Sequence, residues 1–163
     1  TTMDAITLSE DPAIFSHASP YALCPNARNK TDEQIKALAE KGGVIGITAY
    51  APITEVEKGA HPTMDAFLTH VDYVVGLVGV DHVGIGTDHD ETETLEGLIA
   101  YEKAYPEVVG IYNHDKGRMV KGMESVTCFP EITKGLIARG YSDDEIAKIM
   151  GGNFLRVFKK VWG

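Results

Sequence analysis

Two side chains suited to metal and proton chemistry follow two short apolar runs in the sequence. Ser16 and His17 come directly after the run 13–15, and Asp88 follows the run 83–85 after two residues. A neutral imidazole is a good zinc ligand, and a carboxylate can hold a metal ion or act as a general base. Each residue also has a structural alternative: a histidine hydrogen-bonded within the fold, and an aspartate that caps the next segment. If the runs are parallel strands of one sheet, His17 and Asp88 converge at its carboxyl edge.

Arg28 lies in the segment after the first run, where a guanidinium could clamp a substrate carboxylate through two hydrogen bonds. A solvated surface arginine is the alternative. His89 stands beside Asp88, and on an extended chain its side chain points the opposite way. The acidic run 90–93 is interpreted as a solvated loop in preference to a cation site. The other histidines have no spacing typical of a metal site and are expected to be solvated or structural: His61, His70, His82 and His114.

Two other kinds of site are not supported by the spacing of glycine and cysteine. Gly84 and Gly86 lack the third glycine of a dinucleotide-binding fingerprint. Cys24 and Cys128 are far apart and neither lies in a CxxC pair, so a zinc knuckle or a redox motif is not indicated. We expect two buried, reduced thiols.

The elements that would position these residues follow a repeating strand and helix pattern. The runs 13–15, 44–47 and 83–85 are continuously apolar, as is typical of buried parallel strands. Between the first two, a capping box of Thr31 and Gln34 predicts a helix. Between the second and third, Thr63 can cap another helix. The pattern therefore predicts two successive βαβ units.

The chain after the third run reads differently. The stretch 89–129 is polar with weak periodicity, and its length predicts a functional βα loop or lid. Pro130 opens a helix, and a capping box of Ser142 and Glu145 begins another. A break is expected at residues 151–152, followed by a last amphipathic helix whose apolar residues are Phe154, Leu155, Phe158 and Val161.

Strands that alternate with helices predict the α/β class, with a parallel sheet that is either open and doubly wound or part of a (β/α)8 barrel. A complete barrel takes about 250 residues, more than the 163 present here. The first six residues also read as the end of a helix. We therefore expect one partial domain, residues 1–163, and a fragment of a larger unit.

Composition limits the partners. A net charge of −9 and a pI near 5.0 oppose binding to nucleic acid, which requires clustered lysine and arginine. No apolar run is long enough to cross a membrane, and no export signal is present. A cytoplasmic location is favoured, with an upstream export signal left open.

Three blocks of the sequence, in matching order, resemble the membrane (renal) dipeptidase family of zinc peptidases. Residues 12–19 with Arg28 and Asn29 resemble the family's FSHS segment and the loop after it. Residues 81–88 resemble its HVGIGSDFDG strand, and residues 140–157 its RGYS…GGNFLRV block. The resemblance is weakest between about residues 92 and 120.

The resemblance implies a fold, an activity and residue roles. The fold is the C-terminal part of a (β/α)8 TIM-type barrel, with about three parallel strands and flanking helices, in a family that holds two zinc ions and hydrolyses dipeptides. His17 would ligate one zinc ion. Asp88 would be the catalytic acid/base for the proton of the zinc-bridging water. Arg28 would bind the terminal carboxylate of the dipeptide substrate.

The sequence also departs from the family pattern. The family's His-x-Asp pair, bridging glutamate and second zinc-binding histidine belong to earlier strands, so we expect these 163 residues alone to be inactive. His89 and Glu91 replace a phenylalanine and a glycine, which leaves another barrel metallohydrolase open. A third possibility is a truncated, non-catalytic homologue that binds a partner or forms a homo-oligomer through its open edges.

Overall fold

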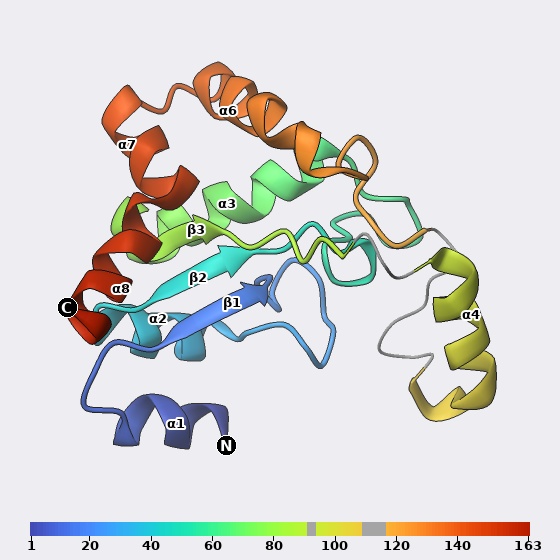
Figure 1. Cartoon of the computed structure of the whole chain (residues 1–163), viewed down its shortest axis with the longest axis horizontal. Coiled ribbons are helices and arrows are strands. Elements are labelled where there is room, and N and C mark those ends of the chain that lie inside the picture. Colours follow the sequence, from blue (N-terminus) through green and yellow to red (C-terminus); the bar gives the residue numbers. More distant parts are fainter. Residues whose placement is uncertain (91–93, 109–116) are drawn as a thin grey trace.

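The computed structural model describes residues 1–90, 94–108 and 117–163, and within them the strands form one parallel sheet. The strands are β1 (Ile14–Ala18), β2 (Val44–Ile47) and β3 (Val83–Ile85), in the order β1-β2-β3 (Figure 1). Phe15 pairs with Ile45, and Ile45 with Val83. The expected α/β class and its three parallel strands are confirmed, and closure into a (β/α)8 barrel stays a prediction. His114 and most of the acidic run, including Glu91, lie outside the described residues.

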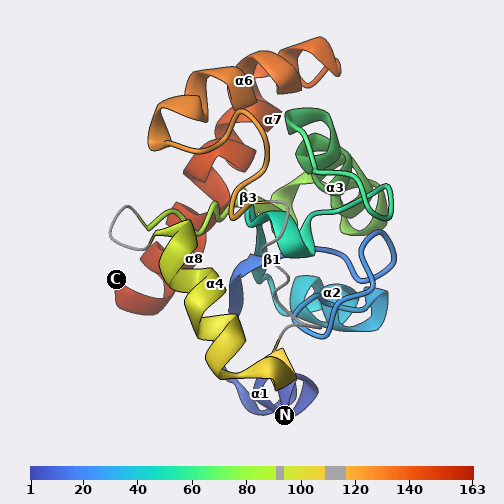
Figure 2. The same cartoon turned by 90° about the vertical axis from the view of Figure 1, so that its right-hand side faces the viewer.

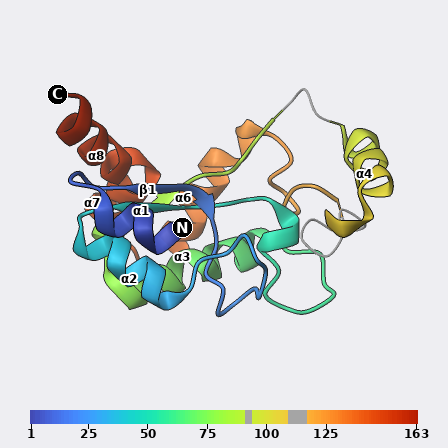
Figure 3. The same cartoon turned by 90° about the horizontal axis from the view of Figure 1, so that it is seen from below.

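Helices α2 (Asp32–Glu40) and α3 (Met64–Val78) connect the strands and cover one face of the sheet (Figure 3). The predicted capping box at Thr31 is present with both of its hydrogen bonds. Thr63 occupies the first position before α3, but its side chain makes no capping bond. Ile45 and Ile47 on the strands are fully buried against the apolar faces of these helices. Burial of this face fixes the direction in which each strand presents its other side chains.

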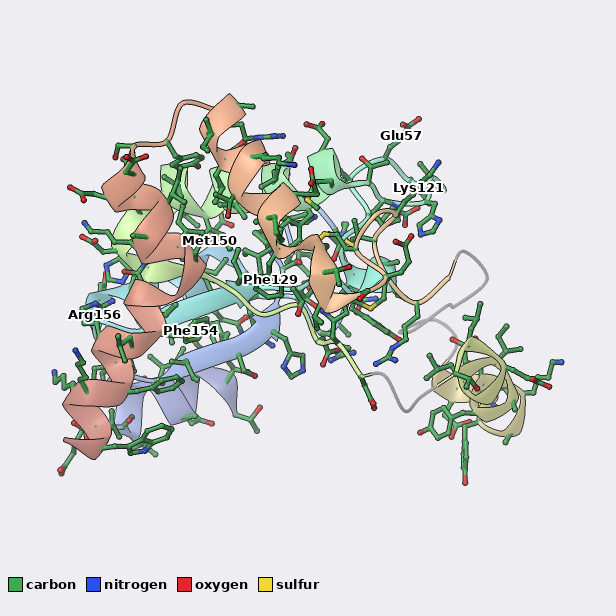
Figure 4. The ribbon with its side chains drawn as sticks, turned by 45° about the horizontal axis from the view of Figure 1, so that its top comes forward. Glu57, Lys121, Phe129, Met150, Phe154 and Arg156 are labelled. Carbon is green, nitrogen blue, oxygen red and sulfur yellow. The ribbon has the colours of Figure 1, made fainter. Side chains whose placement is uncertain are left out.

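The opposite face of the sheet carries glycines, and an aromatic ring fills the space above them. Phe154 extends from α8 (Asn153–Trp162) toward the strands (Figure 4). A Cβ atom on Gly84 would lie only 2.4 Å from this ring, so an alanine there would collide with it. The last amphipathic helix is therefore confirmed. Two of its predicted apolar residues, Leu155 and Val161, are nevertheless exposed, and Val157 is buried instead.

The described part of the segment 89–129 includes a helix. It contains α4 (Leu95–Ala104), which begins at Thr94 with a hydrogen bond from the amide of Gly97 to the threonine side chain. Helix α4 lies beyond the carboxyl ends of the strands, apart from the other helices (Figures 1 and 2). The sequence pattern did not indicate this helix, because only Leu98 and Glu102 of α4 are buried and the apolar periodicity is correspondingly weak. The function of the segment as a loop or lid stays a prediction.

The remaining elements agree with their predicted starts and stops. Helix α1 (Thr2–Leu8) precedes the sheet, α6 (Phe129–Ala138) carries Pro130 in its first turn, and α7 (Asp143–Ala147) starts with the predicted capping box. A π-helical turn, Lys148–Gly152, joins α7 to α8 with a kink at Gly151. Short 3-10 turns are Ala51–Ile53, Val80–His82, Pro106–Val108 and Val126–Cys128.

Both cysteines are buried and unpaired with one another, as predicted. Burial raises the pKa of the Cys24 and Cys128 thiols, which keeps them protonated. In the part of the chain that the structure describes, no helix has the length and apolar character needed to span a membrane.

Candidate active site

His17 and Asp88 meet at the carboxyl edge of the sheet. The imidazole Nε2 of His17 lies 4.0 Å from Oδ1 of Asp88, and both side chains are about one-third exposed, at 39% and 34%. The Nδ1 atom of His17 is 2.8 Å from the hydroxyl oxygen of Ser16, which orients the ring. Strand β1 extends to Ala18, so His17 lies inside the strand and not just after it. The predicted convergence of the two residues is confirmed.

Glycines explain how residues from the two outer strands come so close. Strand β2 lies between β1 and β3, yet a Cβ atom added to Gly86 would be 1.9 Å from the carbonyl oxygen of Ser16. A Cβ atom on Gly46 would be 2.4 Å from the same oxygen. The sheet is therefore curved strongly enough for β1 to approach the end of β3, and only glycine leaves room for that approach.

Asp88 adopts a left-handed backbone conformation, with φ of 62°, which no other non-glycine residue among those described has. Such conformations are uncommon outside glycine, although aspartate tolerates them better than most residues, and they concentrate at functional sites. This turn also overturns the expectation that His89 continues an extended chain and points away.

His89 instead connects two parts of the chain. Its Nδ1 lies 2.8 Å from the hydroxyl oxygen of Thr87, and its Nε2 lies 2.8 Å from the carbonyl oxygen of Met123. A carbonyl oxygen can only accept, so Nε2 carries the proton and donates. His89 thus joins Thr87, at the end of β3, to Met123, in the segment before α6. It follows Asp88 directly in the sequence. A cavity of about 520 Å³ opens beside it, lined by residues that include His61, His89, Leu95, Arg118, Met119 and Glu124.

Arg28 lies on the loop after β1, beside the end of β2. Its guanidinium carbon is 5.4 Å from the centroid of the Tyr50 ring, a cation–π distance. Tyr50 is only 5% exposed, so the ring is a fixed support. Burial lowers the pKa of Lys30, and the positive charge of nearby Arg28 lowers it further. Two neighbouring cations make this loop a suitable place for an anionic group.

The other described histidines have structural roles, as predicted. His70 is fully buried on α3, its Nε2 lies 3.1 Å from the carbonyl oxygen of Thr54, and burial lowers its pKa to about 4. His82 lies at the opposite, amino end of the strands, with Nδ1 2.9 Å from the carbonyl oxygen of Gly43. His61 makes a 2.9 Å bond with the carbonyl of Met119.

An imidazole nitrogen and a carboxylate oxygen are donors that zinc and similar divalent ions accept. The imidazole of His17 is such a donor, and the carboxylate of Asp88 lies 4.0 Å from it. Across residues 1–90, 94–108 and 117–163, however, no group of three or more histidine, cysteine, aspartate or glutamate side chains is gathered as a metal site. The described residues alone therefore do not form a complete metal site.

Comparison with known proteins identifies a family. The profile of the membrane dipeptidase family, peptidase family M19, matches residues 1–110 and 106–162. Dipeptidase ataJ of Aspergillus terreus (strain NIH 2624 / FGSC A1156) is 35% identical over 161 residues, which are 99% of this chain and 33% of that protein. Dipeptidase aclJ of Aspergillus oryzae (strain ATCC 42149 / RIB 40) is 30% identical over 161 residues, 99% of this chain and 32% of that protein.

Solved structures share the fold. An amidohydrolase from Pseudomonas aeruginosa superimposes with a TM-score of 0.82 at 33% identity, over 100% of this chain and 50% of that one. A metallopeptidase from Rhodobacter sphaeroides, liganded with a phosphinate mimic of the dipeptide L-Ala-D-Ala, gives a TM-score of 0.76 at 23% identity, over 99% of this chain and 39% of that one. The chain thus spans between a third and a half of these relatives.

The family profile covers nearly the whole chain, and the two fungal relatives are named as dipeptidases. The family to which it belongs is the membrane dipeptidase family, peptidase family M19. The recognition of this family from the sequence is confirmed.

The sequence pattern indicates no role in the site for Asn29 or Leu95, and Asn29 was named only as part of the block that resembles the family's loop. Asn29 follows Arg28 and looks like an ordinary loop asparagine, so only the structure reveals its contacts. Leu95 lies in a segment whose helix the sequence pattern did not predict.

Proposed function

We propose that this chain carries the substrate-binding and proton-transfer part of a zinc dipeptidase, in a protein whose remaining metal ligands lie outside these 163 residues. The observation that carries the proposal is the 4.0 Å approach of His17 and Asp88 at the carboxyl edge of the sheet. The sheet is proposed to be the last part of a (β/α)8 barrel, in which active sites gather at that edge.

Each residue has one proposed task. His17 binds the metal ion through Nε2, with its ring held by Ser16. When bound, the ion polarises the scissile carbonyl and lowers the pKa of water. Asp88 takes up the proton released during attack and passes it to the leaving amine. Arg28 binds the terminal carboxylate of the dipeptide through two charge-assisted hydrogen bonds.

The dipeptide as substrate is supported by the names of the fungal relatives and by the dipeptide mimic bound to the Rhodobacter sphaeroides metallopeptidase. The 520 Å³ cavity beside His89 has the volume range of small-molecule sites and can take up a substrate side chain. Because the family's phenylalanine is replaced by His89, we propose that this cavity prefers a more polar side chain than a phenylalanine-lined one would.

The test compares the 163-residue chain with the longest native polypeptide that carries it. Metal content by plasma emission spectroscopy and hydrolysis of a dipeptide panel are measured for both, before and after chelation. We expect metal-dependent hydrolysis only in the longer polypeptide, and His17→Ala to lower both metal content and rate. Asp88→Asn should keep the fold and lower kcat by about 10²–10⁴-fold, the usual contribution of a general acid/base.

Matched controls separate the site from the rest of the molecule. His82→Ala removes a histidine at the opposite end of the strands and should leave metal content and rate unchanged. Lactams and lactones are included in the panel because another barrel hydrolase would prefer one of them. Full activity in Asp88→Asn, or no dipeptide hydrolysis by the metal-loaded protein, contradicts the proposal.

A further inference from the structure

Asn29 is a buried loop residue whose side-chain amide joins three separate backbone points. It is 5% exposed. Its Oδ1 accepts a hydrogen bond from the amide of Ser19 at 3.0 Å, and its Nδ2 donates to the carbonyls of Cys24 and Ile53, both at 2.9 Å. An asparagine amide has two N–H donors and one carbonyl acceptor, so every donor is used.

These three points belong to the segments that form the site. Ser19 lies two residues beyond His17, and Cys24 lies within the loop that leads to Arg28. Ile53 ends the 3-10 turn Ala51–Ile53, which begins directly after Tyr50. One side chain therefore connects the end of β1, the Arg28 loop and the segment that follows β2.

The neighbouring contacts hold Arg28 itself. Its amide donates to Oδ1 of Asn26 at 3.0 Å, and the ammonium of Lys30 donates to its carbonyl at 2.8 Å. Its guanidinium lies over the ring of Tyr50. Because Asn29 ties this loop to the turn next to Tyr50, it fixes the distance between the arginine and its aromatic support.

We propose that Asn29 is a positioning residue that sets Arg28 for binding the substrate's terminal carboxylate. The inference rests on the proposed function of Arg28. Without the Asn29 amide, the Ser19 amide and the Ile53 carbonyl lose this partner, and the Cys24 carbonyl keeps only its bond from the Asn26 amide. The Arg28 loop then loses its asparagine link to the turn 51–53. Substrates without a terminal carboxylate do not use Arg28 and are insensitive to the change.

The experiment uses the metal-loaded native polypeptide that carries the chain, with a dipeptide and the same dipeptide amidated at its C-terminus. For Asn29→Ala we expect KM for the free acid to rise about tenfold or more, while kcat changes less than threefold, because the arginine binds ground state and transition state alike. The free-acid over amide ratio of kcat/KM should fall as it does in Arg28→Ala. Asn29→Asp, which keeps the size but loses both donors, gives the same reading if the alanine variant does not fold.

Asn153 is the matched control, since it is the same residue type in a similar setting. It is 2% exposed, and its Nδ2 donates to the carbonyls of Val80 and Val83, both at 2.7 Å, near the amino end of β3. Asn153→Ala should destabilise the protein without changing the free-acid over amide ratio. An equal fall of the ratio in both variants would mean a general loss of structure and overturns the inference.

A double-mutant cycle with Arg28→Ala gives the decisive result. If Asn29 acts through Arg28, Asn29→Ala adds no further change in the ratio once Arg28 is absent. Additive effects, or an unchanged ratio in a folded Asn29→Ala protein, overturn the inference while leaving the role of Arg28 intact. If Arg28→Ala itself leaves the ratio unchanged, the proposed carboxylate-binding role fails first and the inference fails with it.

Discussion

His70 gives the chain a specific dependence of stability on pH. Its ring is fully buried, Nε2 donates to the carbonyl of Thr54, and Nδ1 has no hydrogen-bond partner among the described residues. Protonation would place a cation in the core, so burial lowers the pKa of His70 from its ordinary 6.5 to about 4. Above pH 6.5 the ring is neutral in both folded and unfolded chains, and it contributes no pH dependence.

Below pH 6.5 the unfolded chain binds a proton at this position that the folded chain does not. The free energy of unfolding therefore falls as the pH falls, and it stops falling near pH 4, where the folded chain also takes up the proton. A difference of about 2.5 pKa units, at about 1.4 kcal/mol each, amounts to roughly 3 kcal/mol. The free energy of unfolding of domains of this size is about 5–15 kcal/mol, with about 10 kcal/mol as a round value. The loss is a large part of that total.

The assay is urea unfolding between pH 7.5 and 4, followed by circular dichroism, because the single tryptophan, Trp162, is 76% exposed and reports little on the core. His70→Gln removes the titrating ring and keeps a polar donor. Wild type should lose roughly 3 kcal/mol more than this variant between pH 6.5 and 4. Parallel pH profiles for the two proteins would refute the reasoning, because carboxylates elsewhere contribute equally to both.

Two further predictions concern matched pairs of residues. Gly86→Ala forces a Cβ atom against the backbone of β1, so it should cost several kcal/mol of stability and most of the activity. Gly76 lies in α3 with open space around it, so Gly76→Ala should change stability by about 1 kcal/mol at most, in the stabilising direction. Urea unfolding of both variants checks this, and equal effects would contradict the packing argument. Thr31→Ala removes a capping box and should cost about 1 kcal/mol, whereas Thr63→Ala, which removes no capping bond, should cost a few tenths. Equal losses in these two thermal or urea denaturation series would show that the hydrogen bond is not what stabilises α2.

Strong local signals in the sequence were sufficient for most elements. The capping boxes at Thr31 and Ser142, the continuous apolar run of β2 and the kink near Gly151 each depend on neighbouring residues, so the helices and strands that they specify could be predicted. Helix α4 could not, because its short apolar face is interrupted by glycine and polar residues. The extent of β1 was underestimated, since Ser16 and His17 are polar although they continue the strand.

The candidate site could be predicted in its residues but not in its geometry. Strand ends bring His17 and Asp88 to one edge by topology alone, and the spacing of the runs is enough to infer that. The positive φ of Asp88 is a matter of backbone strain. His89 bonds to Met123, 34 residues away, and Asn29 bonds to Ser19 and Ile53, 10 and 24 residues away. Such contacts have no local sequence signal, so the roles of His89 and Asn29 emerge only when the chain is folded.

The tight passage of β1 across Gly46 and Gly86 has a consequence for tracing this protein's distant relatives. A histidine or aspartate can be exchanged for another donor, but a backbone carbonyl within van der Waals contact of a Cα atom admits no side chain at all. An alignment anchored on these two glycines therefore matches the positions that allow the curvature of the sheet, even where the catalytic residues have diverged. Where either glycine is missing from an aligned sequence, the two outer strands must be farther apart, and a shared reaction should not be inferred from a matching histidine and aspartate alone.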